Sequence, residues 1–319
     1  MDDIRLEISK LIGEPINPQL PRPVEIDAIA DVDTANPGEK VFYFASQDTD
    51  PDEIYYVNTT NGKIVEVKRD PLADTALTFQ GLNSREEYVL IDSVLNSPDV
   101  DVLGRKKEAI TRGMDKLEIK LILDAIIALG GVVTITPTSG EDLYDVIVRA
   151  KHALEDYGDG YVLLAGSSVK EAIDTYDKDK AGTFNYNVDL VGRLAKMGIK
   201  IVKIFGQVKT GDAAANEADT GTVSALLDAN KLILVAVNSR IAKGKPLHFV
   251  RRRISPEIAK LMGAEVDGAQ RALVVANTPV NLAGANTLGY GVYGYESIIW
   301  AIKNVKAMVK SADLSSILW

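Results

Sequence analysis

The first 38 residues limit what this chain can fold into more than any other segment does. They contain five prolines and no sustained apolar period. A segment of this kind is predicted to be extended and poorly able to pack on itself. It is therefore either a disordered tail or an arm that lies over a neighbouring molecule.

A β-hairpin is predicted directly after the arm, within residues 39–82. Two β-prone runs, 54–57 and 64–67, flank a turn in which Asn61-Gly62 favours positive φ angles. Neither face of the second run is apolar enough for a deep core, so we expect the hairpin to project and to pack outside its own domain. Its predicted assembly-interface residues are Tyr55, Tyr56, Val57, Ile64, Val65 and Val67.

A long helix is predicted within residues 98–130, because apolar side chains recur there at steps of three and four until the chain reaches Gly130-Gly131. With about 25 residues and a rise of about 1.5 Å per residue, this helix would be close to 40 Å long. Such a helix is a rod rather than a typical domain helix. A short strand is predicted to follow at 132–136.

The rest of the chain alternates between strand-like and helix-like runs. The predicted helices span residues 143–154, 169–176, 188–197 and 297–310. The predicted strands span residues 161–165, 199–205, 232–237, 247–254 and 272–276. Ser139 and Asp142 resemble a capping box before the first of these helices, and the small, polar residues 206–221 are interpreted as a loop.

The sequence GYGVYGYES near the C-terminus contains the spacing Gly289-x-Gly291-x-x-Gly294, which is typical of dinucleotide-binding folds. Such a site needs a strand joined to the glycines by a tight turn, then a helix and a second parallel strand. The predicted strand 272–276 ends about 12 residues too early, and the 25 residues after Gly294 cannot form a second unit. We therefore interpret the glycines as relieving a strand or turn beside the neighbouring tyrosines.

The sequence offers no self-consistent catalytic set. The sequence AGSS at 165–168 joins a predicted strand to a predicted helix, but a single glycine is not a phosphate-binding loop, and a serine-capped turn is favoured. His152 and His248 have no second histidine at metal-ligand spacing and are interpreted as packed or surface residues. We therefore expect no enzymatic activity and no cofactor, and we assign no catalytic, cofactor-binding or metal-ligating residue.

Charge and composition argue against further classes of protein. Cysteine is absent, which excludes disulfides and thiolate metal sites, and a net charge of −9 argues against a dedicated nucleic-acid binder. The acidic stretches 48–53 and 177–182 depart from the calcium-loop pattern and are interpreted as solvated loops. Arg251–Arg253 is interpreted as a solvated or salt-bridged strand end. No apolar run approaches the roughly 20 residues that cross a bilayer, so no membrane partner is expected.

The order of the predicted elements is unusual: an extended arm, a projecting hairpin, one long helix and then α/β units. In this order, and in its late glycine- and tyrosine-rich segment, the chain resembles the major capsid proteins of tailed bacteriophages. These proteins have the Hong Kong 97-type fold, an α+β fold that encapsulin shells share. The resemblance covers nearly the whole chain and rests on the order of the elements rather than on a short motif.

The resemblance implies a division of the chain into five parts. These are an N-terminal arm (1–38), an extended loop that contains the hairpin (39–82), a peripheral domain with the spine helix (83–140), an axial domain (141–230), and late strands with a final helix shared by both domains (231–319).

The resemblance also implies a function. Such a subunit self-assembles into hexamers and pentamers, which close into an icosahedral head around double-stranded DNA without binding it sequence-specifically. The protein would then belong to the virion and assemble in the host cytoplasm. Scaffolding and portal proteins would be its further partners. Whether a decoration protein also binds is left open by the resemblance.

Two alternatives remain open on the sequence alone. One is an encapsulin-type nanocompartment shell, which would need a cargo-binding inner surface. The other is a soluble α/β enzyme that binds a nucleotide near residues 161–205. The enzyme predicts small oligomers and a ligand-dependent melting temperature, whereas both shells predict very large particles.

Overall fold

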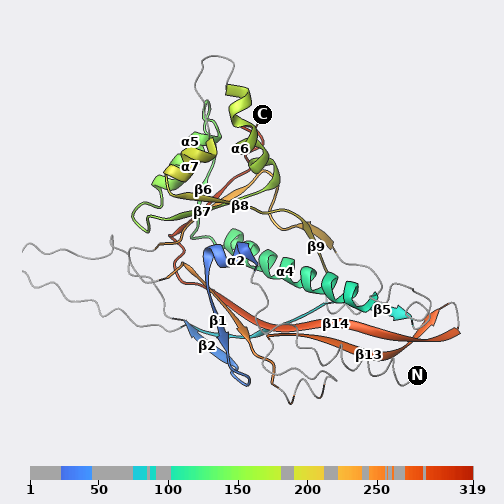
Figure 1. Cartoon of the computed structure of the whole chain (residues 1–319). Coiled ribbons are helices and arrows are strands. Elements are labelled where there is room, and N and C mark those ends of the chain that lie inside the picture. Colours follow the sequence, from blue (N-terminus) through green and yellow to red (C-terminus); the bar gives the residue numbers. More distant parts are fainter. Residues whose placement is uncertain are drawn as a thin grey trace, which may run out of the picture.

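The structure is a computed structural model of the chain, in which a helix-covered sheet stands above a long helix and an extended sheet (Figure 1). It describes residues 23–44, 75–84, 87–90, 102–180, 190–211, 222–238, 244–255, 257, 261, 270–282 and 285–318.

The lower sheet is six-stranded and is organised around the long strand β14. Its strands are β1 (Ala30–Ala35), β4 (Gln80–Asn83), β5 (Glu87–Leu90), β12 (Leu247–Arg252), β13 (Arg271–Leu282) and β14 (Ala285–Ile302). Ile298 of β14 pairs with Arg251 of β12 and with Gln80 of β4, and Glu296 pairs with both β13 and β4. A residue has one partner on each side of its strand, so β12 and β13 follow each other along one side of β14 while β4 and β5 lie along the other.

Helix α4 (Val102–Ala128) lies along this sheet and confirms the predicted long helix (Figure 1). Its apolar face is buried, with Met114, Ile122 and Ile126 each at most 2% exposed. A Cβ atom added to Gly294 of β14 would lie 2.5 Å from Met114 Sδ and 2.8 Å from Ile110 Cγ2. This glycine therefore allows the helix and the strand to approach closely, which explains part of the glycine spacing without a nucleotide.

The upper sheet is five-stranded, in the order β6-β15-β11-β7-β8. Its strands are β6 (Val133–Ile135), β7 (Tyr161–Ala165), β8 (Ile199–Lys203), β11 (Leu232–Ala236) and β15 (Met308–Ser311). Every residue of β7 and β11 is buried, because both faces of the sheet are covered. Helices α5 (Leu143–His152), α6 (Ser167–Lys180) and α7 (Leu190–Lys196) contribute to the core on one face, and α4 to the core on the other.

The second half of the predicted arm packs into the fold as a short helix and a strand. Residues 24–29 form helix α2 (Val24–Ile29), and β1 continues from it and pairs in parallel with β12. Ile26 and Ile29 are each 2% exposed and join the core beneath the five-stranded sheet. The expectation that these residues are extended and pack poorly was wrong for residues 24–29, because isoleucines three residues apart share one face of a single helical turn.

Two further strand pairs lie outside the main sheets. They are β2 (Val41–Phe44) with β3 (Thr75–Thr78), and β9 (Gln207–Thr210) with β10 (Thr222–Ala225). The second pair corrects the predicted loop 206–221, in which residues 207–210 are a strand. Its strands escaped prediction because only Val208 is buried, so they carry no apolar pattern.

The predicted final helix is wrong. Its residues form the end of β14, up to Ile302, and the strand β15, which begins at Met308. Apolar residues at steps of three and four suggested a helix, but Ile298 and Ile299 are both buried, on opposite faces of β14. A strand covered on both faces reads as a continuous apolar run, which periodicity cannot separate from a buried helix.

The cap of α5 lies three residues later than predicted. The Asp142 carboxylate accepts a hydrogen bond from the Asp145 N–H at 3.1 Å, and the Asp145 carboxylate accepts one from the Asp142 N–H at 3.2 Å. Asp142 with Asp145, rather than Ser139 with Asp142, therefore forms the reciprocal cap.

Candidate assembly site

The predicted interface residues lie outside the described part of the chain: Tyr55, Tyr56, Val57, Ile64, Val65 and Val67. The structure does describe the two strands that border them. Val41 of β2 pairs with Thr78 of β3, and Phe44 pairs with Thr75. Residues 45–74 therefore leave and re-enter the fold at one antiparallel pair, which is the base that a projecting loop requires.

This loop base is fastened to the six-stranded sheet. The Arg252 guanidinium of β12 donates a hydrogen bond to the Glu39 carbonyl at 2.9 Å and lies 5.1 Å from the centre of the Phe79 ring. Leu77 and Phe79 pack against the sheet face that carries Val250. The loop base is thus held on the sheet face opposite to the core that contains α4.

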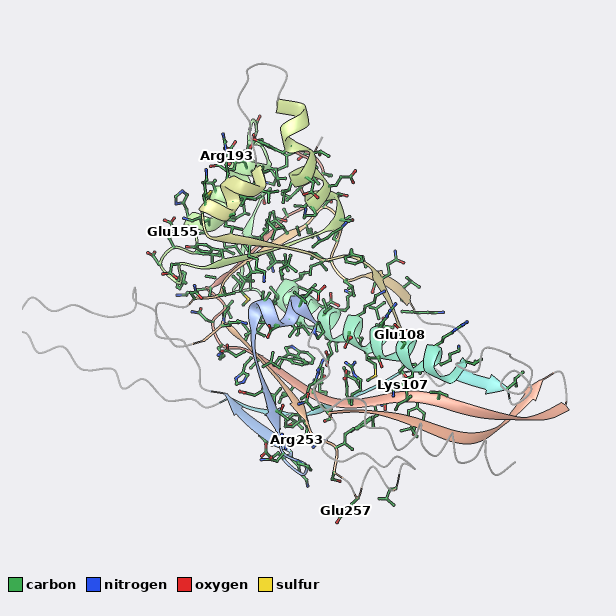
Figure 2. All side chains as sticks on the ribbon, viewed as in Figure 1. Lys107, Glu108, Glu155, Arg193, Arg253 and Glu257 are labelled. Carbon is green, nitrogen blue, oxygen red and sulfur yellow. The ribbon has the colours of Figure 1, made fainter. Side chains whose placement is uncertain are left out.

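A buried charge cluster joins α4 to the same sheet. Arg251 of β12 binds Glu118 of α4 in a bidentate manner, with Nε–Oε1 at 2.8 Å and Nη2–Oε2 at 2.5 Å. The Glu118 side chain is completely buried and that of Arg251 is 2% exposed. Of the two states expected for Arg251–Arg253, Arg251 therefore has the salt-bridged one, in the interior, whereas Arg253 is exposed (Figure 2).

Arg271 of β13 extends the cluster to β14. Its Nε donates to Glu296 Oε2 at 2.6 Å, and its Nη1 donates to Asp115 Oδ1 at 2.8 Å and to the Thr111 carbonyl at 3.2 Å. Its Nη2 lies 3.6 Å from Glu118 Oε1. The cluster, defined as Asp115, Glu118, Arg251, Arg271 and Glu296, thus fixes α4 relative to three strands.

The cluster contains three carboxylates and only two guanidinium groups. Burial, followed by the charge of Glu118, raises the pKa of the Glu296 carboxyl to about 7. Its Oε1 is buried and has no hydrogen-bond partner among the described residues, so the ionised form is poorly solvated. Burial alone lowers the pKa of Arg271, but the charges of Glu296, Glu118 and Asp115 raise it above its usual value. A proton on Glu296 would leave two carboxylates for the two guanidinium groups of the cluster.

Sequence reasoning missed this cluster. Glu118 lies within the apolar pattern of α4, and Arg271 and Glu296 are 25 residues apart in the chain. A charged residue on the apolar face of a predicted helix was the one available signal. The pattern could not identify its partners, because two different strands supply them.

The turn predicted as a weak nucleotide candidate is already occupied. The N–H groups of Ser168 and Val169, at the start of α6, donate to the Ala229 carbonyl at 3.1 and 3.2 Å. A Cβ atom added to Gly166 would overlap the Asp228 carbonyl oxygen. The backbone of residues 228–229 thus fills the position where a phosphate would bind a helix N-terminus, and a nucleotide has no place at this turn.

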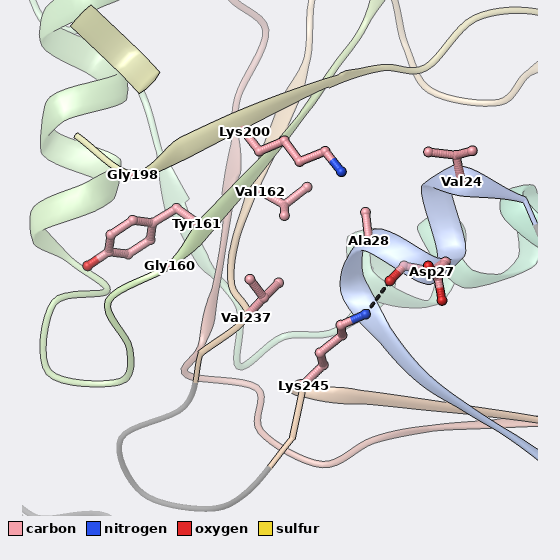
Figure 3. Close-up of a pocket in the computed structure, with 10 residues that line it drawn as sticks. All are labelled: Val24, Asp27, Ala28, Gly160, Tyr161, Val162, Gly198, Lys200, Val237 and Lys245. Atoms are coloured by element: carbon pink, nitrogen blue, oxygen red, sulfur yellow. Dashed lines mark hydrogen bonds between the residues drawn. The ribbon is translucent and has the colours of Figure 1, made fainter. Parts of the chain in front are cut away.

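A cleft of about 450 Å³ lies between α2 and the first residues of β7 and β8 (Figure 3). The side chains of Val24, Ala28, Val162 and Val237 contribute its apolar lining. The Lys245 amine donates to the Asp27 carbonyl at its edge and so fastens α2 to the segment that enters β12. The cleft is therefore a junction between elements, and we assign no reaction to it.

The two histidines occupy the predicted kinds of position. His152 is exposed at the end of α5, with Nδ1 3.2 Å from Glu155 Oε2, and His248 Nε2 lies 2.6 Å from Asp33 Oδ2 between β12 and β1.

The structure describes only part of the two acidic stretches that were predicted as solvated loops. Asp177 and Asp179 belong to helix α6 rather than to a loop, whereas residues 48–53 lie outside the described part of the chain. Within the described residues, no group of three or more potential metal ligands occurs and no helix is long and apolar enough to cross a membrane.

Solved structures show the same fold over nearly the whole chain. The capsid of a native GTA particle is 12% identical, covers 94% of this chain and 93% of its own, and has a TM-score of 0.52. A phage-related protein from Bordetella bronchiseptica RB50 is 12% identical, covers 93% of each chain and has a TM-score of 0.51. A structure from Mycobacterium phage Bobi is 13% identical, covers 97% of each chain and has a TM-score of 0.50.

No family model and no curated protein matches the sequence. The likeness to solved structures therefore establishes the fold, which is the Hong Kong 97-type capsid fold. The α+β class expected from the order of the elements is confirmed.

Proposed function

We propose that this protein is the major capsid protein of a phage-type particle and assembles into hexamers and pentamers of a closed shell. The observation that carries the proposal is the shared fold over 94% of the chain, together with the anchored base from which residues 45–74 leave the subunit. A segment that cannot bury itself becomes useful when a neighbour covers it, and repeated contacts of this kind close a shell.

A head that encloses double-stranded DNA is the specific form that we propose. Three solved structures with TM-scores of 0.50 or more come from a phage, a phage-related protein and a GTA particle, and this supports a phage-type head. The net charge of −9 also suits a wall that retains DNA without adhering to it. On this proposal the protein belongs to the virion and meets scaffolding and portal proteins during assembly in the host.

The division of labour within the subunit is part of the proposal. The six-stranded sheet with α4 would form the peripheral domain, and the five-stranded sheet with its helices would form the axial domain around which subunits meet. The charge cluster would keep α4 fixed to the peripheral sheet while subunits contact one another.

The test is negative-stain microscopy with sedimentation velocity on the full chain and on a variant in which residues 48–68 are replaced by a Gly/Ser linker of equal length. We expect shells or hexameric tiles from the full chain, and a folded but unassembled variant. Particles from the linker variant would contradict the role of the loop. Small oligomers that bind a nucleotide would contradict the shell itself.

The contents of purified particles distinguish the head from a nanocompartment. Nuclease-protected DNA is the result expected for a phage-type head. A defined protein cargo without protected DNA would identify a nanocompartment shell instead.

A further inference from the structure

Helix α4 packs on the lower sheet, but its C-terminal end lies beneath the upper one (Figure 1). The Lys310 amine of β15 donates hydrogen bonds to the carbonyls of Ile127 and Leu129, at 2.6 and 3.0 Å. These carbonyls lie at the end of α4, where a helix leaves its last carbonyl groups without partners of its own. A side chain of the upper sheet therefore satisfies the end of a helix that packs on the lower sheet.

The sequence of α4 does not supply such a partner itself. Its last turn contains no basic residue, although cations are favoured at a helix C-terminus, where the helix dipole is negative. Neither Gly130 nor Gly131 has a positive φ angle, so these residues do not form the left-handed glycine cap that ends many helices. Lys310 fulfils both roles, because its amine brings positive charge as well as hydrogen-bond donors.

The register of β15 directs Lys310 toward α4. Met308 is completely buried in the core that contains α4, whereas Val309 is buried in the core on the other face of the sheet. Successive side chains of a strand alternate between its two faces, so Lys310 lies on the same face as Met308. Lys310 also pairs with Thr134 of β6, the strand that follows α4 in the chain. The contact therefore lies where the chain passes from α4 into the upper sheet.

The core around this contact is apolar. Ile122 and Ile126 of α4 share it with Val162 of β7 and Val235 of β11. Apolar contact is not directional, and cores tolerate small shifts when the volume is kept. Hydrogen bonds from one amine to two carbonyl groups, in contrast, depend on both distance and angle. Lys310 therefore adds a directional contact to a junction that is otherwise held by apolar packing.

We propose that Lys310 sets the angle between the two sheets of the subunit, and with it the curvature at which subunits join. The charge cluster fixes α4 to the lower sheet, and Lys310 fixes the upper sheet to α4. The angle is a property of the single chain. The effect on curvature rests on the proposed shell function, because a closed particle of one size needs subunits of one shape.

The angle is measured on unassembled full-length chains by pulsed electron spin resonance. The chain has no cysteine, so two introduced cysteines carry the spin labels. One label replaces the exposed Glu171 of α6, and the other replaces the exposed Arg253 directly after β12. We expect one narrow distance distribution with Lys310 in place. Lys310→Met keeps a side chain of similar length without a donor, and we expect a broader distribution because the upper sheet can then tilt on its apolar contacts.

Two further variants separate this role from a general loss of structure. Lys310→Arg should retain the narrow distribution, because a guanidinium group can donate to both carbonyls. Lys196→Met removes an exposed lysine at the end of α7 and should leave the distribution unchanged. A label pair at the exposed Asp156 and Glu171, both above the upper sheet, should give the same distances in every variant.

The curvature is measured on assembled particles by cryo-electron microscopy. Chains with Lys310 should give particles of one diameter. Lys310→Met should give several diameters or open sheets, and Lys310→Arg should restore the single diameter. If Lys310→Met does not fold, as circular dichroism would show, Lys310→Gln replaces it, because its side chain is too short to reach both carbonyls.

The outcomes separate this inference from the shell proposal. Equal distance distributions with and without the Lys310 amine would overturn the inference and leave the shell intact. A broader distribution together with particles of unchanged diameter would overturn the effect on curvature. A wild-type chain that forms no particles would contradict the shell proposal, while the distances in unassembled chains would still decide whether Lys310 sets the angle.

Discussion

The two large sheets of this protein bury their faces with different chemistry. In the five-stranded sheet, β7 and β11 are apolar and buried at every position, and helices cover them with aliphatic side chains. In the six-stranded sheet, the contact with α4 includes the five ionisable groups of the charge cluster, among them Glu118 and Arg271. The first contact depends mainly on burial and packing, and the second also depends on exact charge pairing.

The two contacts are expected to respond differently to side-chain substitutions. Apolar surfaces tolerate small shifts if volume is conserved, whereas a bidentate ion pair fixes both distance and orientation. Breaking a buried ion pair is costly because the remaining charge is left without a partner and without water to solvate it. The upper sheet is thus the tolerant unit, and the α4–sheet junction is the one with a single defined geometry.

The largest expected effect comes from removing the centre of the cluster. Glu118→Ala should lower the free energy of unfolding by about 3–5 kcal/mol, because Arg251 would remain buried without its partner. Urea unfolding of unassembled chains measures this loss. The matched control is Asp124→Ala on the same helix, where the carboxylate is 50% exposed and bound to Lys120, and where a loss below about 1 kcal/mol is expected. Equal losses in the two variants would remove the contrast between the sheets.

A slightly smaller effect is expected in the apolar sheet. Leu163 is completely buried in the centre of β7, and Leu163→Ala should cost about 3 kcal/mol through lost burial and the cavity left behind. Leu163→Met should recover most of that loss, because its volume is similar. A methionine variant as unstable as the alanine variant would show that this sheet is as exacting as the charge cluster. The same urea experiment applies.

The smallest effect is a pH dependence that only the cluster should show. The pKa of Glu296 is raised to about 7, so the folded chain binds a proton more tightly than the unfolded chain does. This contribution to stability is present at acidic pH and is lost as the pH rises toward and through 7. Between pH 7.5 and 5.5 it should add about 2 kcal/mol to the wild-type free energy of unfolding.

The matched variant is Glu296→Gln, in which this increment should disappear while other titrating groups stay the same. The comparison is the difference between the two proteins at each pH, measured by urea unfolding. An unchanged difference from pH 5.5 to 7.5 would show that Glu296 does not hold the extra proton.

Elements with a local apolar pattern could be predicted from the sequence. The long helix, strands β7 and β11, and helices α5 to α7 were predicted close to their observed bounds, because each carries its own period or apolar run. The order of these elements was enough to indicate the Hong Kong 97-type fold. The glycine spacing at Gly289 to Gly294 was correctly not interpreted as a nucleotide site, because too few residues follow it to form a second strand–helix unit.

Features that depend on partners distant in the chain could not be predicted from local patterns. Residues 297–302 are a strand because both of their faces are covered, and Gly294 is needed because α4 crosses there. The charge cluster exists because Glu118 meets arginines from β12 and β13, and because Arg271 also binds Glu296 of β14. Local patterns indicate which residues are buried, but not which residues contact one another in the folded chain. Burial on two faces and charge pairing across elements are therefore fixed by packing alone.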